Sequence, residues 1–231
     1  MATSVQAARG AATTPPPGES PALTWLVQWI KGHRQAAGMI AAVIVIAAGL
    51  VWWNMLSRSR VETAASQRLE QARLAFEARN YPLAASELSQ LVENYSGTRA
   101  AAQANLVLAQ VRLYQGQGQQ AIDLLTRVAP SVGKDFSGQA YGLLGAAYEN
   151  VSHPAEAAGA YEEAARRAPL AFLKAQYLSD AGRTWVAAGD TTKALRDYQA
   201  IVSGMDSTAT VAEARVRIGE LTRGAVGTGT R

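Results

Sequence analysis

The sequence contains no cysteine and only two histidines, His33 and His153. The absence of cysteine excludes disulfides and thiolate metal sites. Two histidines leave few places for catalysis that depends on a histidine base. Charged residues make up only 17% of the 231 residues, which is low for a wholly soluble protein. This composition points to a membrane segment before it points to an enzyme.

A stripe of charge of one sign is also missing. The net charge is +4, and three of the basic residues, Arg9, Lys31 and Arg34, precede Ser57. In the rest of the chain acidic and basic residues are interleaved and nearly balanced. This pattern is typical of a solvated surface and not of a nucleic-acid-binding face. We therefore expect no nucleic-acid partner.

One long apolar run is present. Residues 36–53 read AAGMIAAVIVIAAGLVWW and carry no charge. Because roughly 20 helical residues span the hydrocarbon core, we predict a transmembrane helix over residues 35–57, with Trp52 and Trp53 in an interfacial aromatic belt. The alternative, a buried core helix, would rarely be apolar on every face. A cleaved signal peptide is disfavoured because the run begins late and no small-x-small site follows it.

The segment before this run has two parts. Residues 1–19 are rich in Pro, Ala and Thr, which predicts a flexible tail. Ser20 and Pro21 are typical of a helix start, and polar and apolar residues then follow at helical spacing. We predict an amphipathic interfacial helix over residues 20–34; the alternative is a helix packed on a partner subunit. The expected membrane-interface residues are Trp25, Trp29, Lys31, Arg34, Trp52 and Trp53.

The rest of the chain contains an internal repeat. Residues 143–169, LLGAAYENVSHPAEAAGAYEEAARRAP, place small and aromatic residues at regular intervals on two helical halves. Four alanines, Ala84, Ala121, Ala157 and Ala194, are spaced by 37, 36 and 37 residues. A period of this size with paired helices indicates an α-solenoid. Small residues allow two helices to pack closely, and larger side chains fill the space between neighbouring pairs.

The repeat resembles the tetratricopeptide repeat. The residues that match its signature are Leu144, Gly145, Tyr148, Ala157, Tyr161, Ala164 and Pro169, and Gly182, Trp185, Ala194 and Tyr198 match it again. We expect an all-α fold: a single N-terminal transmembrane helix followed by a tetratricopeptide-like (TPR-like) α-solenoid of about four helix pairs plus a capping helix. The solenoid is expected over residues 58–223, followed by a flexible tail at 224–231. The predicted helices are 58–79, 82–95, 99–115, 119–129, 135–151, 154–168, 170–188, 191–203 and 208–223.

Candidate sites for chemistry are few. The glycine-rich QGQGQQ has no strand before it, as a phosphate-binding loop requires, and so indicates a turn between helices. His153 has no second metal ligand nearby in the sequence. No set of nucleophile, base and oxyanion donors is found. We expect a protein that is not an enzyme, with no catalytic residue, cofactor, metal or small-molecule substrate.

The resemblance implies a partner-binding groove instead. In tetratricopeptide folds the first helix of each pair lines the concave face. Carried over by spacing, the groove residues are Leu69, Arg73, Phe76, Leu106, Gln110, Leu113, Tyr114, Ala146, Glu149, Asn150, Arg183 and Val186. The alternative for the apolar ones is that they belong to the core.

Residues 29–72, WIKGHRQAAGMIAAVIVIAAGLVWWNMLSRSRVETAASQRLEQA, resemble the bacterial ancillary SecYEG translocon subunit family. That resemblance implies a single-pass protein of the bacterial inner membrane, with a cytoplasmic N-terminus and a periplasmic TPR-like domain. Its implied role is to attend the translocon and pass exported chains to periplasmic chaperones. Counting basic residues on either side of the apolar run favours the opposite orientation.

The second hypothesis is an accessory structural subunit of another large inner-membrane complex, respiratory, photosynthetic or division-related. Such a subunit would dock through its transmembrane and amphipathic helices. Under either hypothesis the expected partners are other proteins, as subunits of a membrane complex, and the lipid bilayer.

Overall fold

The computed structural model describes residues 34–204 and 209–227, and its regular structure over these residues is entirely helical. The helices, in chain order, are α2 (Arg34–Glu77), α3 (Tyr81–Asn94), α4 (Arg99–Tyr114), α5 (Gly118–Val128), α6 (Lys134–Asn150), α7 (Pro154–Arg167), α8 (Ala171–Ala187), α9 (Thr191–Gly204) and α10 (Ala209–Gly227). The predicted tail at 1–19 and most of the predicted interfacial helix at 20–34, with Trp25, Trp29 and Lys31, lie outside the described residues. Arg34 is the first residue of α2.

The chain divides into two compact units, Met1–Ser57 and Arg58–Arg231, and the boundary falls within the 44 residues of α2. The sequence predicted separate helices over 35–57 and 58–79, whereas the structure has one. In the first unit the large apolar side chains of α2 are exposed on all sides, from 41% at Leu56 to 73% at Trp52. In the second unit α2 buries a stripe of Ala65, Leu69, Ala72 and Ala75. Their spacing of three or four residues is that of one face of a helix.

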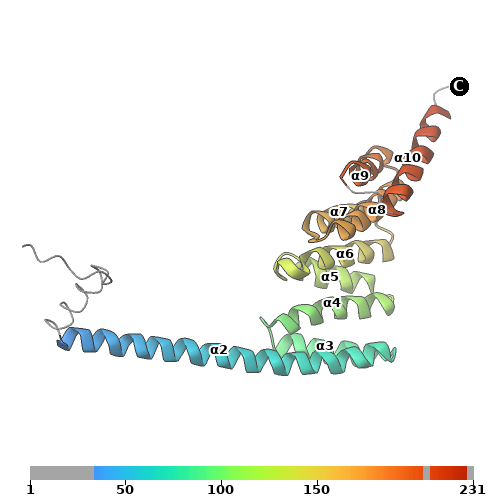
Figure 1. The fold of residues 1–231 in the computed structure, drawn as a ribbon. Coiled ribbons are helices and arrows are strands. Elements are labelled where there is room, and N and C mark those ends of the chain that lie inside the picture. The colour runs from blue at the N-terminus through green and yellow to red at the C-terminus, as the bar shows by residue number, and fades with distance from the viewer. Residues whose placement is uncertain (1–33, 205–208, 228–231) are drawn as a thin grey trace, which may run out of the picture. The chain divides into compact units, whose positions relative to one another are not determined.

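The second unit is a stack of helix pairs. Figure 1 shows α3 to α10 following one another in chain order, each packed on the next. The pairs are α2/α3, α4/α5, α6/α7 and α8/α9, and α10 packs on both α9 and α8. This arrangement confirms the predicted solenoid of four pairs with a capping helix. The sequence placed the end of that helix at Arg223, and the structure extends α10 to Gly227.

Each pair is closed by a small residue on its first helix and a large residue sixteen positions later on its second. A Cβ on Gly145 would lie 2.7 Å from Cε1 of Tyr161, and one on Gly182 would lie 2.8 Å from Cζ of Tyr198. The first two repeats place fully buried alanine and leucine at the same positions, Ala72 with Leu88 and Ala109 with Leu125. Larger rings are therefore matched with glycine, and smaller side chains with alanine, as close packing requires.

Successive repeats are also joined by a polar contact. The carboxylate of Glu62 on α2 accepts the backbone N–H groups of Arg99 and Ala100, both at 2.9 Å. These N–H groups belong to the first turn of α4, where they have no partner inside their own helix. Thr98 accepts a third, from Ala101, at 3.0 Å. The negative charge also complements the dipole of α4 at its N-terminus.

The contact of Gly145 with Tyr161 generates a stability prediction. Replacing Gly145→Ala should destabilise the solenoid by about 1–3 kcal/mol, because the added methyl overlaps the ring. Gly159→Ala is the control: nothing lies within 4 Å of its Cβ position, so it should be neutral or stabilising, by up to about 1 kcal/mol. Urea unfolding measures both. The double variant Gly145→Ala/Tyr161→Leu, which reproduces the alanine and leucine of the first repeats, should recover part of the loss. Equal effects of the two single glycine substitutions would contradict this account.

Candidate partner-binding groove

The residues predicted to line the groove all lie on the first helices of the pairs, α2, α4, α6 and α8. Two of them are in the core: Leu69 is 4% exposed and Leu106 is 2% exposed. The prediction that these two line a groove is therefore wrong, because a partner cannot reach side chains that already pack inside the domain. The surface that remains has two chemically different ends.

The end formed by the first two repeats is aromatic. Phe76 on α2, Tyr81 on α3 and Tyr114 on α4 form a cluster with ring centroids 5.5–5.9 Å apart. The two tyrosine rings are parallel within 6°, and Phe76 is tilted against both. Tyr114 nevertheless remains 66% exposed. A large, rigid and exposed ring such as Tyr114, packed on two half-buried rings, supplies contact area at low entropic cost when a partner covers it.

The end formed by the last two repeats is polar and internally paired. Both guanidinium Nη atoms of Arg183 donate to the Glu149 carboxylate, at 2.6 and 3.0 Å. The hydroxyl of Tyr161 donates to Oε2 of the same carboxylate at 2.7 Å. The hydrogen bond from Arg183 lowers the pKa of Glu149 below its ordinary value, although burial opposes the shift. At this end, the charges of Glu149 and Arg183 are thus already paired with each other.

The other predicted groove residues vary in exposure. Gln110, Leu113 and Ala146 are half-buried, and Leu113 packs against the core. Asn150 and Val186 are exposed. Arg73 is half-buried and lies 3.9 Å from Glu70 on its own helix. A partner in this groove would therefore contact apolar and amide surface more than free charge.

Comparison with known proteins decides the family. A family model described as a tetratricopeptide repeat-like domain matches residues 54–171. The chain belongs to this family. The TPR-like fold generally mediates protein–protein interactions. The helices beyond Ala171 lie outside the match but continue its geometry, as Gly182 and Tyr198 repeat the packing of Gly145 and Tyr161.

Solved structures agree on the fold. A crystal structure of MamA is 18% identical and aligns with a TM-score of 0.54, covering 67% of this chain and 84% of that one. A kinesin light chain with TPR-like repeats from Podosopora anserina is 16% identical with a TM-score of 0.57, covering 72% and 89%. No curated protein matches the chain. At these identities the likeness shows a TPR-like solenoid and no more.

The sequence did not indicate Tyr81 as a site residue. The turn that ends α2 and begins α3 brings it against Phe76, with Asn80 accepting the N–H of Leu83 at 3.3 Å as the helix cap. The signal available was two aromatic residues on either side of an Asn-containing turn. Groove residues were instead assigned only to first helices, and Tyr81 opens a second helix.

The most perturbed carboxyl of the described residues lies outside the groove, on α9. Asp197 is 3% exposed and receives Nε and Nη2 of Arg196 on Oδ1, at 3.1 and 3.0 Å. Its Oδ2 accepts no hydrogen bond from the described part of the chain. Burial, with the nearby Glu162 carboxylate, raises the pKa of Asp197 to about 6. Glu162 itself accepts the Trp185 indole N–H at 2.6 Å, so the cluster joins the third repeat to the fourth.

Asp197 generates a pH prediction. The pKa of Asp197 is higher in the folded state than in the unfolded chain, so protonation of this carboxyl stabilises the folded state. That stabilisation is lost as pH rises from about 4 through about 6. Asp197→Asn has no such loss and should be more stable than the parent by about 1–2 kcal/mol at pH 7, but not at pH 4. Unfolding in urea across this range measures the difference.

Asp190→Asn is the control of opposite sign. The backbone N–H of Lys193 donates to the Asp190 carboxylate at 3.0 Å and lowers its pKa. Its contribution is therefore present at pH 7 and lost on acidification. Parallel stability profiles for the two variants would show that Asp197 does not titrate as an interior carboxyl.

Proposed function

We propose that this protein is a membrane-anchored TPR scaffold that holds other proteins through its groove. One observation carries the proposal. The first part of α2 exposes its apolar side chains, and the same chain continues from it into a TPR-like domain. It is the helix, among the described residues, that is long and apolar enough to cross a membrane. A single N-terminal helix of this kind is compatible with single-pass anchoring.

The physical case rests on the exposure of this segment. Val45, Leu50 and Trp53 are between 65% and 72% exposed, and their neighbours in the run are similar. Apolar surface of this extent on every face of a helix is unfavourable in water, and a lipid bilayer removes the cost. The tryptophans at its end suit the interface between acyl chains and headgroups.

The more specific part of the proposal concerns location and partner. The resemblance of residues 29–72 to the ancillary translocon subunit family favours the bacterial inner membrane, a cytoplasmic N-terminus and a periplasmic TPR-like domain. On this hypothesis the partners are the translocon and periplasmic chaperones. The alternative is an accessory subunit of a respiratory, photosynthetic or division complex. The aromatic cluster, with its exposed Tyr114, suits either hypothesis, because an apolar ring can contact a partner of either kind without requiring a particular charge on it.

The anchor is tested by a charge in the middle of the run. Val45→Arg should shift the full-length protein from the carbonate-resistant membrane fraction to the soluble or degraded fraction, because a central arginine costs about 2.5–3.5 kcal/mol on insertion. The control Ser66→Arg, an exposed position of α2 in the second unit, should remain in the membrane. Extraction of the parent protein by carbonate alone would contradict anchoring.

The orientation can be measured in the same membranes by labelling single introduced cysteines, because the chain has no cysteine of its own. A membrane-impermeant maleimide should label Ser203→Cys in intact spheroplasts, and Ser4→Cys only after lysis. The reverse pattern would place the TPR-like domain in the cytoplasm.

The partner is tested by purification in mild detergent with quantitative mass spectrometry. Translocon or chaperone subunits should be recovered with the parent protein, and their yield should fall at least about tenfold with Tyr114→Ala, which removes an exposed ring of the aromatic cluster. Val216→Ala, at an apolar residue of α10 with similar exposure, is the matched control and should retain them. Recovery of a different membrane complex would favour the alternative. Equal recovery with both variants would show that the aromatic cluster is not the binding surface.

A further inference from the structure

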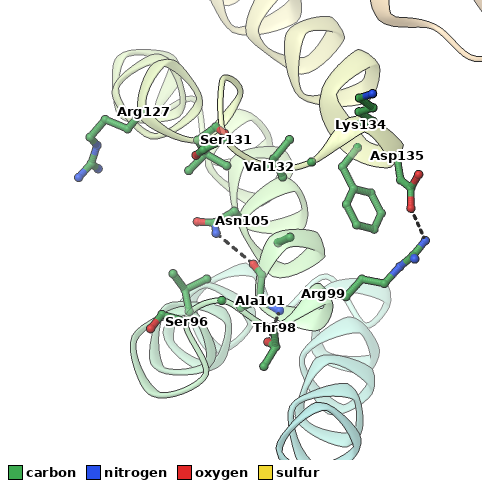
Figure 2. A pocket seen from close by; sticks show the side chains of 16 residues that line it. Ser96, Thr98, Arg99, Ala101, Asn105, Arg127, Ser131, Val132, Lys134 and Asp135 are labelled. Atoms are coloured by element: carbon green, nitrogen blue, oxygen red, sulfur yellow. Dashed lines mark hydrogen bonds and ion pairs between the residues drawn. The ribbon is translucent and has the colours of Figure 1, made fainter. Parts of the chain in front are cut away.

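A pocket lies away from the predicted groove residues, between the loop that joins α3 to α4 and the loop that joins α5 to α6. It encloses about 640 Å³, and none of the predicted groove residues lines it. Figure 2 shows Ser96 and Thr98 on one side of the hollow, Ser131 and Val132 on the other, and Asn105 between them. The apolar part of the lining includes Val92, Val128, Val132 and Phe136. The hollow is thus wide enough for a peptide segment, with both polar and apolar walls.

The charged side chains of this pocket are mostly basic. Arg99, Arg127 and Lys134 line it, against one carboxylate, Asp135. Arg99 pairs with Asp135 at 3.0 Å, and its guanidinium lies 5.2 Å from the Phe136 ring centroid. Arg127 donates its Nε to the backbone carbonyl of Asp123, and within the described residues Lys134 has no ion-pair partner. Two positive charges at the pocket are therefore left without a matching carboxylate.

The N-terminus of α6 adds to this positive character. Its N-cap is Gly133, at φ +89°, which offers no side chain to accept the first N–H groups. The N-terminus of α4 on the opposite wall differs, because Thr98 and Glu62 satisfy it. The N–H of Phe136 already donates to the carbonyl of Gly133 at 3.2 Å, which leaves the N–H groups of Lys134 and Asp135 at the start of this helix of 17 residues, where a carboxylate oxygen is favoured.

The pocket also holds an acceptor that has no donor. Nδ2 of Asn105 donates to the carbonyl of Ala101 at 3.0 Å, which fixes the orientation of the amide. Its Oδ1 is buried and accepts no hydrogen bond from the described residues. Buried acceptors are normally satisfied, and the N–H of a peptide backbone is a donor that fits beside an apolar wall.

We propose that this pocket binds an extended acidic segment of a partner protein. Carboxylates of the segment would meet Lys134, Arg127 and the first N–H groups of α6. An apolar side chain of the segment would lie on Val132 and Phe136, and a backbone N–H would donate to Asn105. Charge complementarity selects an acidic occupant, while the apolar wall and the amide acceptor favour a peptide over a nucleic acid. The pocket does not depend on the groove, so the two sites can be tested separately.

The test uses the full-length protein in detergent and a short fluorescent peptide, blocked at both ends, in which glutamates flank a central leucine. Fluorescence anisotropy should show saturable binding that weakens as salt is raised. Arg127→Glu/Lys134→Glu should weaken binding at least about tenfold, and Lys174→Glu, an exposed lysine on α8, should leave it unchanged. Asn105→Leu, which removes the acceptor and keeps a similar shape, should also reduce binding without lowering the melting temperature.

Several outcomes would overturn the proposal. One is the absence of saturable binding by the parent protein. A second is equal binding of a peptide with lysine in place of glutamate. A third is loss of binding with Tyr114→Ala but not with Arg127→Glu/Lys134→Glu, which would place the peptide in the groove. A fourth is tighter binding of a single-stranded oligonucleotide through the same two basic residues, which would assign the pocket to another class of partner.

Discussion

The solenoid depends on the contact between a small residue on the first helix of each pair and a larger side chain on the second. Where the second helix carries a tyrosine, the first carries glycine, and where it carries leucine, the first carries alanine. A larger side chain is thereby matched with a smaller partner, so both kinds of pair pack closely even though the side chains differ. Each repeat contacts mainly its neighbours, so close packing within each pair supports the whole stack.

The surface of the predicted groove residues owes its two chemically different ends to this packing. Tyr161 fills the space opened by Gly145, and its hydroxyl reaches the Glu149 carboxylate, which in turn binds Arg183 of the next repeat. A ring that closes one pair therefore also orients a charged pair that joins two. The first two repeats have leucine at the equivalent position, which brings no hydroxyl. There, an aromatic cluster occurs instead, in which Phe76 at the end of α2 is half-buried and Tyr114 at the end of α4 is exposed.

The sequence predicted the architecture because periodicity determines it. A period of 36–37 residues, small residues at the crossings and glycine- or proline-containing turns were enough to place the four pairs and the final helix. Contacts that depend on three-dimensional detail were not predictable in this way. Carrying over the groove by spacing assigned Leu69 and Leu106 to the surface, although a small rotation of a helix about its axis places such residues in the core. The Tyr81 cluster and the pocket around Asn105 arise where loops from different repeats meet, and no short sequence pattern indicates which loops will be neighbours.

The backbone groups that begin α4 are satisfied by Glu62, a residue that precedes them in the chain by a full repeat. The acceptor is thus always synthesised before its donors. A polypeptide that emerges N-terminus first presents the finished end of one helix pair when the next begins to form. Assembly can then proceed repeat by repeat in the direction of synthesis, without waiting for distant parts of the chain.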